Sequence, residues 1–131
     1  MSMIVKRVYD PPASDDGVRV LVDRLWPRGL KKENAGLDGW SKDLAPSDSL
    51  RRWFNHDPGR WEEFCLRYAA ELEARSETWR PLVEAAQRRP VTLLFAARDL
   101  EHNNAVALKT FLDRRVADDP HRGRLSDRIG S

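Results

Sequence analysis

The central strand of this protein is predicted from Val91-Thr92-Leu93-Leu94-Phe95-Ala96-Ala97. A short and nearly unbroken apolar run of this kind is typical of a strand that helices cover on both faces. A helical pattern follows directly, over about residues 100–116, and Asp99 is its expected cap. A strand that leads straight into a helix favours an α/β fold.

Two further strands are predicted, over residues 4–8 and 18–25, because both segments are rich in β-branched and aliphatic residues. The turn-rich loop between them, residues 10–17, is short for a parallel crossover. We therefore expect these two strands to pair antiparallel. Residues 40–44 form either a short edge strand or an irregular segment.

Amphipathic spacing predicts two helices, over residues 60–75 and 77–88, and a shorter one over 47–55. Ser47 is expected to cap this last helix, with a role as a hydroxyl ligand as the alternative. The predicted fold is a single compact three-layer α/β domain. Its small mixed or parallel sheet has three to four strands, with helices on both faces.

The composition fits one domain and excludes several classes of protein. The 131 residues carry 23 basic and 21 acidic side chains, which argues against a strongly basic DNA-coating protein. Residues 1–117 are assigned to the domain and 118–131 to a mobile polar tail. The single cysteine, Cys65, excludes an internal disulfide. With no apolar leader or membrane-spanning stretch in the sequence, a cytoplasmic protein without membrane contact is expected.

The richest candidate for a functional site is Val22-Asp23-Arg24-Leu25-Trp26-Pro27-Arg28-Gly29. Pro27 fixes the chain and Gly29 permits a sharp turn. Asp23, Arg24 and Arg28 would then lie at the carboxyl end of a strand, where open α/β sheets bind ligands. In the alternative interpretation, Asp23 and Arg24 pair with other charges at the sheet edge and Trp26 fills the core.

Two other segments add candidate ligand-binding residues. Arg98 and Asn103 follow the central strand, near a helix N-terminus that attracts anions. Lys42, Ser47 and Arg51 lie between the two arginine-bearing loops in sequence, and Arg51 is either solvated or directed at the same cleft. Trp26 is a candidate for stacking on a flat ligand.

Motifs of several common chemistries are missing. No phosphate loop, dinucleotide-binding glycine motif or serine nucleophile elbow occurs in the chain. The three histidines, His56, His102 and His121, lack metal-ligand spacing. We therefore expect neither a metal site nor a bound cofactor.

The chain resembles domain-of-unknown-function family 488, in its short YeaO-like branch. The resemblance rests mainly on Val20-Leu21-Val22-Asp23-Arg24-Leu25-Trp26-Pro27-Arg28-Gly29, with support from Trp40-Ser41-Lys42, Ala45-Pro46-Ser47, Leu50-Arg51, Glu71-Leu72 and Ala96-Ala97-Arg98-Asp99. It implies a three-layer α/β domain in the cytoplasm. Longer relatives carry Cys-Ala-Glu and Cys-His-Arg near the end of the central strand, where this chain has Phe95-Ala96-Ala97 and His102-Asn103-Asn104. Cysteine-dependent chemistry of those relatives therefore does not transfer to this chain.

Two function hypotheses follow from the residues. The first is a small enzyme or ligand-binding domain for a compact anionic ligand, phosphate- or nucleotide-like. Its arginines grip the anion in bidentate fashion, and Asp23 orients an arginine or, with a raised pKa, acts as general base. The second is a nucleic-acid-associated or regulatory binding module without catalysis, which would use Trp53 for stacking and the arginines Arg51, Arg52, Arg88, Arg89, Arg114 and Arg115 for phosphates.

Overall fold

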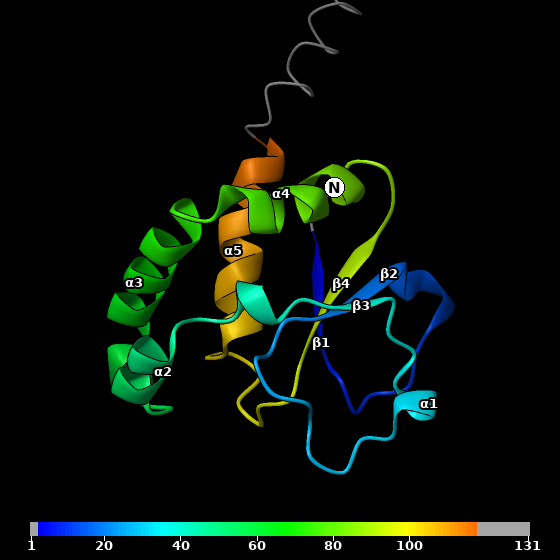
Figure 1. Ribbon diagram of the computed structural model, residues 1–131, viewed down its shortest axis with the longest axis horizontal. Helices are drawn as coiled ribbons and strands as arrows, with labels where there is room; N and C mark the ends of the chain where they lie inside the picture. The colour runs from blue at the N-terminus through cyan, green and yellow to red at the C-terminus, as the bar shows by residue number, and fades with distance from the viewer. Residues whose placement is uncertain (1–2, 118–131) are drawn as a thin grey trace, which may run out of the picture.

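Four parallel strands form one sheet in the order β1-β4-β2-β3. The computed structural model describes residues 3–117 (Figure 1), and its strands are β1 (Ile4–Arg7), β2 (Val18–Leu21), β3 (Gly39–Trp40) and β4 (Val91–Phe95). The predicted α/β class is confirmed, and the sheet is parallel rather than mixed. The predicted C-terminal tail lies outside the described residues.

Strand β4 lies in the middle of the sheet, as its sequence predicts. All five of its residues are buried. Val91, Leu93 and Phe95 face the larger hydrophobic core, whereas Leu94 faces a smaller core on the opposite side. A strand that is covered on both faces has no need for alternating polar residues, which explains the continuous apolar run.

The predicted antiparallel pairing of the first two strands is wrong. Strand β4 lies between β1 and β2, and each of them pairs parallel to it, with Val5 and Val20 both opposite Leu93. Each strand has only four residues, so the chain needs to travel back only about 13 Å from the end of β1 to the start of β2. The loop of residues 8–17 is long enough for that distance, although its helical part is only a single 3-10 turn, Ser14–Asp16.

The longer helices pack on the face of the sheet that carries the larger core (Figure 1). They are α2 (Asp48–Phe54), α3 (Trp61–Glu73), α4 (Ser76–Ala86) and α5 (Asn104–Ala117). Three of them match the predicted ranges closely. No helix among residues 3–117 is long and apolar enough to cross a bilayer.

The fourth of these helices, α5, starts later than predicted. Asp99 was expected to cap it, but the Asp99 carboxylate instead accepts hydrogen bonds from the N–H groups of Glu101 and His102 in a preceding turn. Asn103 provides the cap, because its side-chain oxygen accepts the N–H of Val106 at 3.0 Å. The turn leaves residues 96–103 as a loop at the carboxyl end of β4.

The other face of the sheet is covered mainly by an irregular segment that connects β2 to β3. Trp26, Leu30 and Leu37 of this segment pack with Trp40 over Leu21 and Leu94. Its one helix, α1 (Lys32–Ala35), is a single turn. The segment that carries the candidate site residues 23–29 is therefore also part of the second core.

Candidate functional site

The carboxyl ends of β2 and β4 border a cavity of about 620 Å³, which we call the edge cavity. Its lining comes from five places in the chain: Tyr9 after β1, residues 23–28 after β2, side chains within residues 45–56 around α2, Phe64 of α3, and side chains of the segment 96–104 after β4. Because the strands are parallel, these segments meet at one edge of the sheet. The segments after β2 and β4, which both carry predicted site residues, thus meet at this edge, whereas Lys42, Ser47 and Arg98 do not line the edge cavity.

Asp23 ties the ends of β2 and β4 together. Its Oδ2 atom accepts the N–H of Ala96 at 2.9 Å, and its backbone oxygen accepts the indole N–H of Trp40 at 2.8 Å. Burial raises the pKa of the Asp23 carboxyl, and hydrogen bonds from Ala96 and Asn104 together with the charge of Arg51 oppose this shift without cancelling it. Asp23 is thus a half-buried carboxylate with a positioning role in the loop.

Three arginines line the edge cavity: Arg24, Arg28 and Arg51. Arg24 and Arg51 both contact the same oxygen of Asp48, at 3.2 and 3.0 Å, and about half of each side chain is exposed. Within residues 3–117, Arg28 forms no ion pair. Its backbone oxygen accepts the Tyr9 hydroxyl at 2.8 Å, which fixes the chain at this position.

Trp26 and Lys42 are held by aromatic contacts. The ring of Trp26 meets Trp40 edge to face at 5.4 Å, and its indole N–H bonds to the backbone oxygen of Leu30. Lys42 Nζ lies 4.4 Å from the centre of the Trp40 ring. Trp26 therefore packs in the second core, in line with the alternative interpretation, while one side of it still borders the edge cavity.

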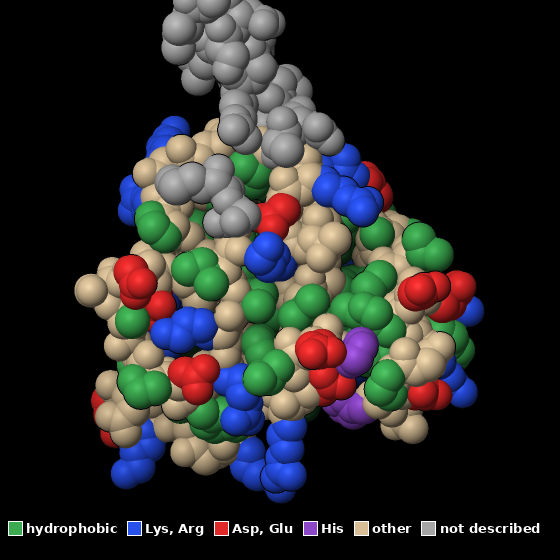
Figure 2. All heavy atoms as spheres, turned by 180° about the vertical axis from the view of Figure 1, so that it is seen from behind, with side chains coloured by type: hydrophobic (Ala, Val, Ile, Leu, Met, Phe, Trp, Pro, Cys, Tyr) green, Lys and Arg blue, Asp and Glu red, His purple; other side chains and the backbone are tan. Residues whose placement is uncertain are grey.

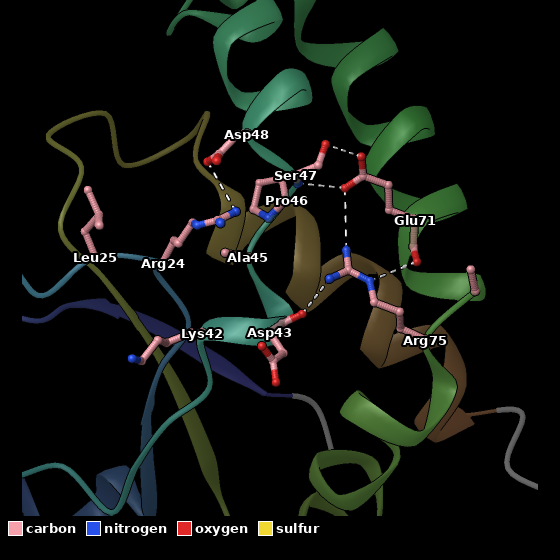
Figure 3. A pocket seen from close by; sticks show the side chains of 11 residues that line it. Arg24, Leu25, Lys42, Asp43, Ala45, Pro46, Ser47, Asp48, Glu71 and Arg75 are labelled. Carbon is pink, nitrogen blue, oxygen red and sulfur yellow. Dashed lines mark hydrogen bonds and ion pairs between the residues drawn. The ribbon is translucent and has the colours of Figure 1, made fainter.

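A second cavity of about 730 Å³ shares Arg24 and Pro46 with the edge cavity, and Figure 3 shows its lining. Ser47 caps α2 as predicted, since its hydroxyl accepts the N–H of Leu50. Glu71 binds both the hydroxyl and the N–H of Ser47, and Arg75 joins Glu71 to the backbone oxygen of Asp43. These side chains bond to one another, so this part of the lining connects α3 to the loop before α2.

Arg98 and Asn103 do not act as a pair in the structure. Asn103 is buried, and its side chain bonds to the backbone of Asp99 and Val106 as a helix cap. Arg98 is exposed and does not line either of the two cavities. Of the two, only Asn103 borders the edge cavity.

Two histidines of the edge cavity, His56 and His102, were not expected as site residues. The sequence separates them widely, but the fold places both on the cavity lining. Glu71 was also missed as a candidate residue, although it belongs to the Glu71-Leu72 pair in the family resemblance. No sequence signal links the two histidines, because only the packing of α2 and α3 against the loop after β4 brings them together.

The arginines of the nucleic-acid hypothesis do not lie together. Helix α2, with Arg51 and Arg52, lies at the opposite end of the molecule from the end of α5, with Arg114 and Arg115 (Figure 1). Trp53 is covered by Arg60 and Arg67, whose guanidinium carbons lie 5.2 and 4.1 Å from its ring. These placements separate the arginines of α2 from those at the end of α5.

Comparison with known proteins fits this geometry. The family model of the inactive DUF488-N3 subclade matches residues 2–128. The chain belongs to the DUF488 family. Of the segment 20–29, on which the resemblance mainly rests, residues 23–28 line the edge cavity.

Two curated relatives are similar over most of their length. The uncharacterized protein YeaO of Escherichia coli K12 is 41% identical over 112 residues, which cover 86% of this chain and 97% of that protein. The uncharacterized protein Rv3073c of Mycobacterium tuberculosis H37Rv is 41% identical over 111 residues, covering 85% and 93% of the two chains. No solved structure matches the chain.

Proposed function

We propose that this member of the DUF488 family binds a compact anionic ligand, phosphate- or nucleotide-like, in the edge cavity without catalysing a reaction. One observation carries the proposal: three arginines line the cavity, and Asp23 and the half-exposed Asp48, which pairs with Arg24 and Arg51, are the carboxylates beside them among the described residues. Arginine is the side chain best suited to bidentate contacts with phosphate and carboxylate groups. The proposal places the protein in the cytoplasm, in agreement with its single cysteine.

The absence of catalysis is inferred from two features. The matching subclade is described as inactive, and the Cys-Ala-Glu segment of the longer relatives is Phe95-Ala96-Ala97 in this chain. Phe95 offers no nucleophile where those relatives have Cys, and Ala97, which lines the cavity, offers no proton donor where they have Glu. The raised pKa of Asp23 would suit a general base, but its carboxylate already accepts the N–H of Ala96, just after β4, so we assign it to positioning.

A thermal-shift screen tests the proposal with inorganic phosphate, nucleotides and small carboxylates. A ligand at about 100 times its dissociation constant adds about 2.7 kcal/mol of stability, which raises the Tm of a domain of this size by several degrees. We expect this shift for the wild type and its loss in Arg28→Ala. Arg80→Ala is the matched control, because it removes the same charge from an exposed position on α4.

Two outcomes would count against the proposal. If Arg80→Ala and Arg28→Ala lose the shift equally, the anion binds through net charge and the edge cavity is not the site. If only oligonucleotides stabilise the protein, and the effect falls steeply with salt, the nucleic-acid hypothesis replaces it.

A further inference from the structure

The edge cavity is much larger than a simple anion. Its volume of about 620 Å³ lies within the range of cavities that hold drug-sized ligands. The three arginines form only part of the lining, and much of the rest is apolar or aromatic, including Tyr9, Pro27, Phe54 and Phe64. A ligand that fills this cavity therefore carries an uncharged part beside its anionic group.

One side of the cavity carries three rings, which we call the histidine wall: Phe54, His56 and His102. Trp61 is not part of the lining, but its ring connects Phe54 to His102. The ring of Phe54 lies 6.4 Å from His56 and 5.9 Å from Trp61, and Trp61 meets His102 edge to face at 5.3 Å. Figure 2 shows two histidine side chains next to one another on this face of the molecule. Flat heterocycles stack on rings of this kind.

His102 is oriented by its neighbours. Its Nδ1 atom lies 3.0 Å from Oδ2 of Asp99, while the other oxygen of Asp99 is fixed by two backbone N–H groups. The carboxylate favours a proton on Nδ1, which leaves Nε2 as an acceptor in the neutral ring. The His102 side chain is 28% exposed and lines the edge cavity, so a ligand in the cavity can contact the ring.

His56 is held in an uncommon backbone conformation. Its φ is +52°, and the preceding Asn55 has a φ of +47°. Asparagine adopts this region more readily than most residues, but a second non-glycine residue beside it is strained. His56 follows Asn55, the C-cap of α2, and its side chain lines the edge cavity.

From these observations we infer that the edge cavity takes a phosphate ester that carries a flat heterocyclic ring, the chemistry of a nucleoside monophosphate. The inference rests on the proposed anion site and extends it. Arg24, Arg28 and Arg51 hold the phosphate, in bidentate contacts where geometry allows. The ring lies against the histidine wall, and Nε2 of His102 accepts a hydrogen bond from a ring N–H or an exocyclic amine.

Titration calorimetry on the full chain tests the inference with three kinds of probe. These are the four common nucleoside monophosphates, ribose 5-phosphate, which has the phosphate but no base, and inorganic phosphate. We expect at least one nucleoside monophosphate to bind ten times more tightly than ribose 5-phosphate. In His102→Ala this ratio should fall below three, whereas the affinity for inorganic phosphate should stay within twofold of the wild type.

Two further variants complete the design. His56→Gly removes the second ring and keeps the backbone, because glycine adopts positive φ without strain, and it should also reduce the ratio. Arg28→Ala should weaken all three kinds of probe.

The possible failures are distinguishable. If ribose 5-phosphate and the nucleoside monophosphates bind equally, the ring site is overturned and the anion site stands. If His102→Ala and His56→Gly both keep the tenfold ratio, the histidine wall is the wrong surface. If neither phosphate nor any ester binds, the inference and the proposed function fall together.

Discussion

Two carboxylates of this protein each lie between two basic side chains, but in opposite environments. In what we call the buried triad, Asp16 bonds to Lys6 at 3.1 Å and to Arg19, and the Asp16 and Arg19 side chains are 4% and 5% exposed. In the exposed triad, Asp48 contacts Arg24 and Arg51, and all three side chains are about half exposed. The number and the sign of the charges are the same in both.

The difference in burial gives the two triads different roles. Arg19 also bonds to the backbone oxygens of Ala35 and Gly36, so the buried triad anchors the segment before β3 to β2. The exposed triad holds its arginines weakly, because water and salt screen exposed ion pairs. The proposed anion would therefore compete with Asp48 for Arg24 and Arg51, whereas the burial of Asp16 shields its ion pairs from such exchange.

The largest effect is expected for Asp16→Asn. Removing this carboxylate leaves the guanidinium of Arg19 buried without its counter-charge, and breaking a buried pair costs about 3–5 kcal/mol. Urea unfolding should show a loss of that size. A loss below about 1 kcal/mol would mean that the buried triad is no more important for stability than a surface ion pair.

The pH dependence of stability should distinguish Asp16 from Asp23. Burial raises the pKa of Asp16, but hydrogen bonds from Ala13, Lys6 and Arg19 lower this pKa by more than burial raises it. The pKa of Asp16 in the folded protein therefore lies below the ordinary value of 3.8. The stability from Asp16 is thus present above pH 3.8 and is lost as the pH falls through the folded-state pKa. Burial raises the pKa of Asp23, so its contribution is present below pH 3.8 and is lost as the pH rises through the folded-state pKa.

Urea unfolding between about pH 3 and pH 7 measures how the free energy of unfolding changes with pH, and so tests both contributions. Relative to the wild type, Asp23→Asn should gain stability as the pH rises, because it carries no buried charge and its amide oxygen can still accept the Ala96 N–H. Asp16→Asn should lose less stability than the wild type on acidification. Parallel curves for all three proteins would contradict both assignments.

The smallest effect on stability is expected for Asp48→Asn. This exposed carboxylate contributes less than about 1 kcal/mol through its ion pairs. The same change frees Arg24 and Arg51, so the affinity for inorganic phosphate should rise several-fold in titration calorimetry. Unchanged or weaker binding would show that the exposed triad is not part of the anion site.

Much of the fold was predictable because its main signals are local. The apolar run of β4 and the helical spacing of α3 and α4 identify these elements correctly. Strand pairing was not predictable in the same way, because the partner of β1 is separated from it by most of the chain. The start of α5 was misplaced because an Asp and an Asn four positions apart are equally good caps, and only the surrounding loop selects Asn103.

The candidate site was predicted in part for the same reason. Asp23, Arg24 and Arg28 lie in one short segment with a rigid Pro27, so their position at a strand end follows from local sequence. Arg98 comes directly after the same kind of strand end, yet it lies outside the edge cavity. The direction of a long exposed side chain depends on its neighbours in space, and these cannot be identified from the sequence around it.

The amino-acid sequence alone determined the α/β class, the central strand and the arginine-bearing loop after β2, because hydrophobic periodicity and turn chemistry act over a few residues. Only the tertiary structure decided that β4 separates β1 from β2, that Asp16 is buried while Asp48 is exposed, and that His56 and His102 meet on one wall. These features arise from contacts between segments far apart in the chain. Burial then gives similar charged groups different energies, because the cost of removing a charge from water depends on its surroundings.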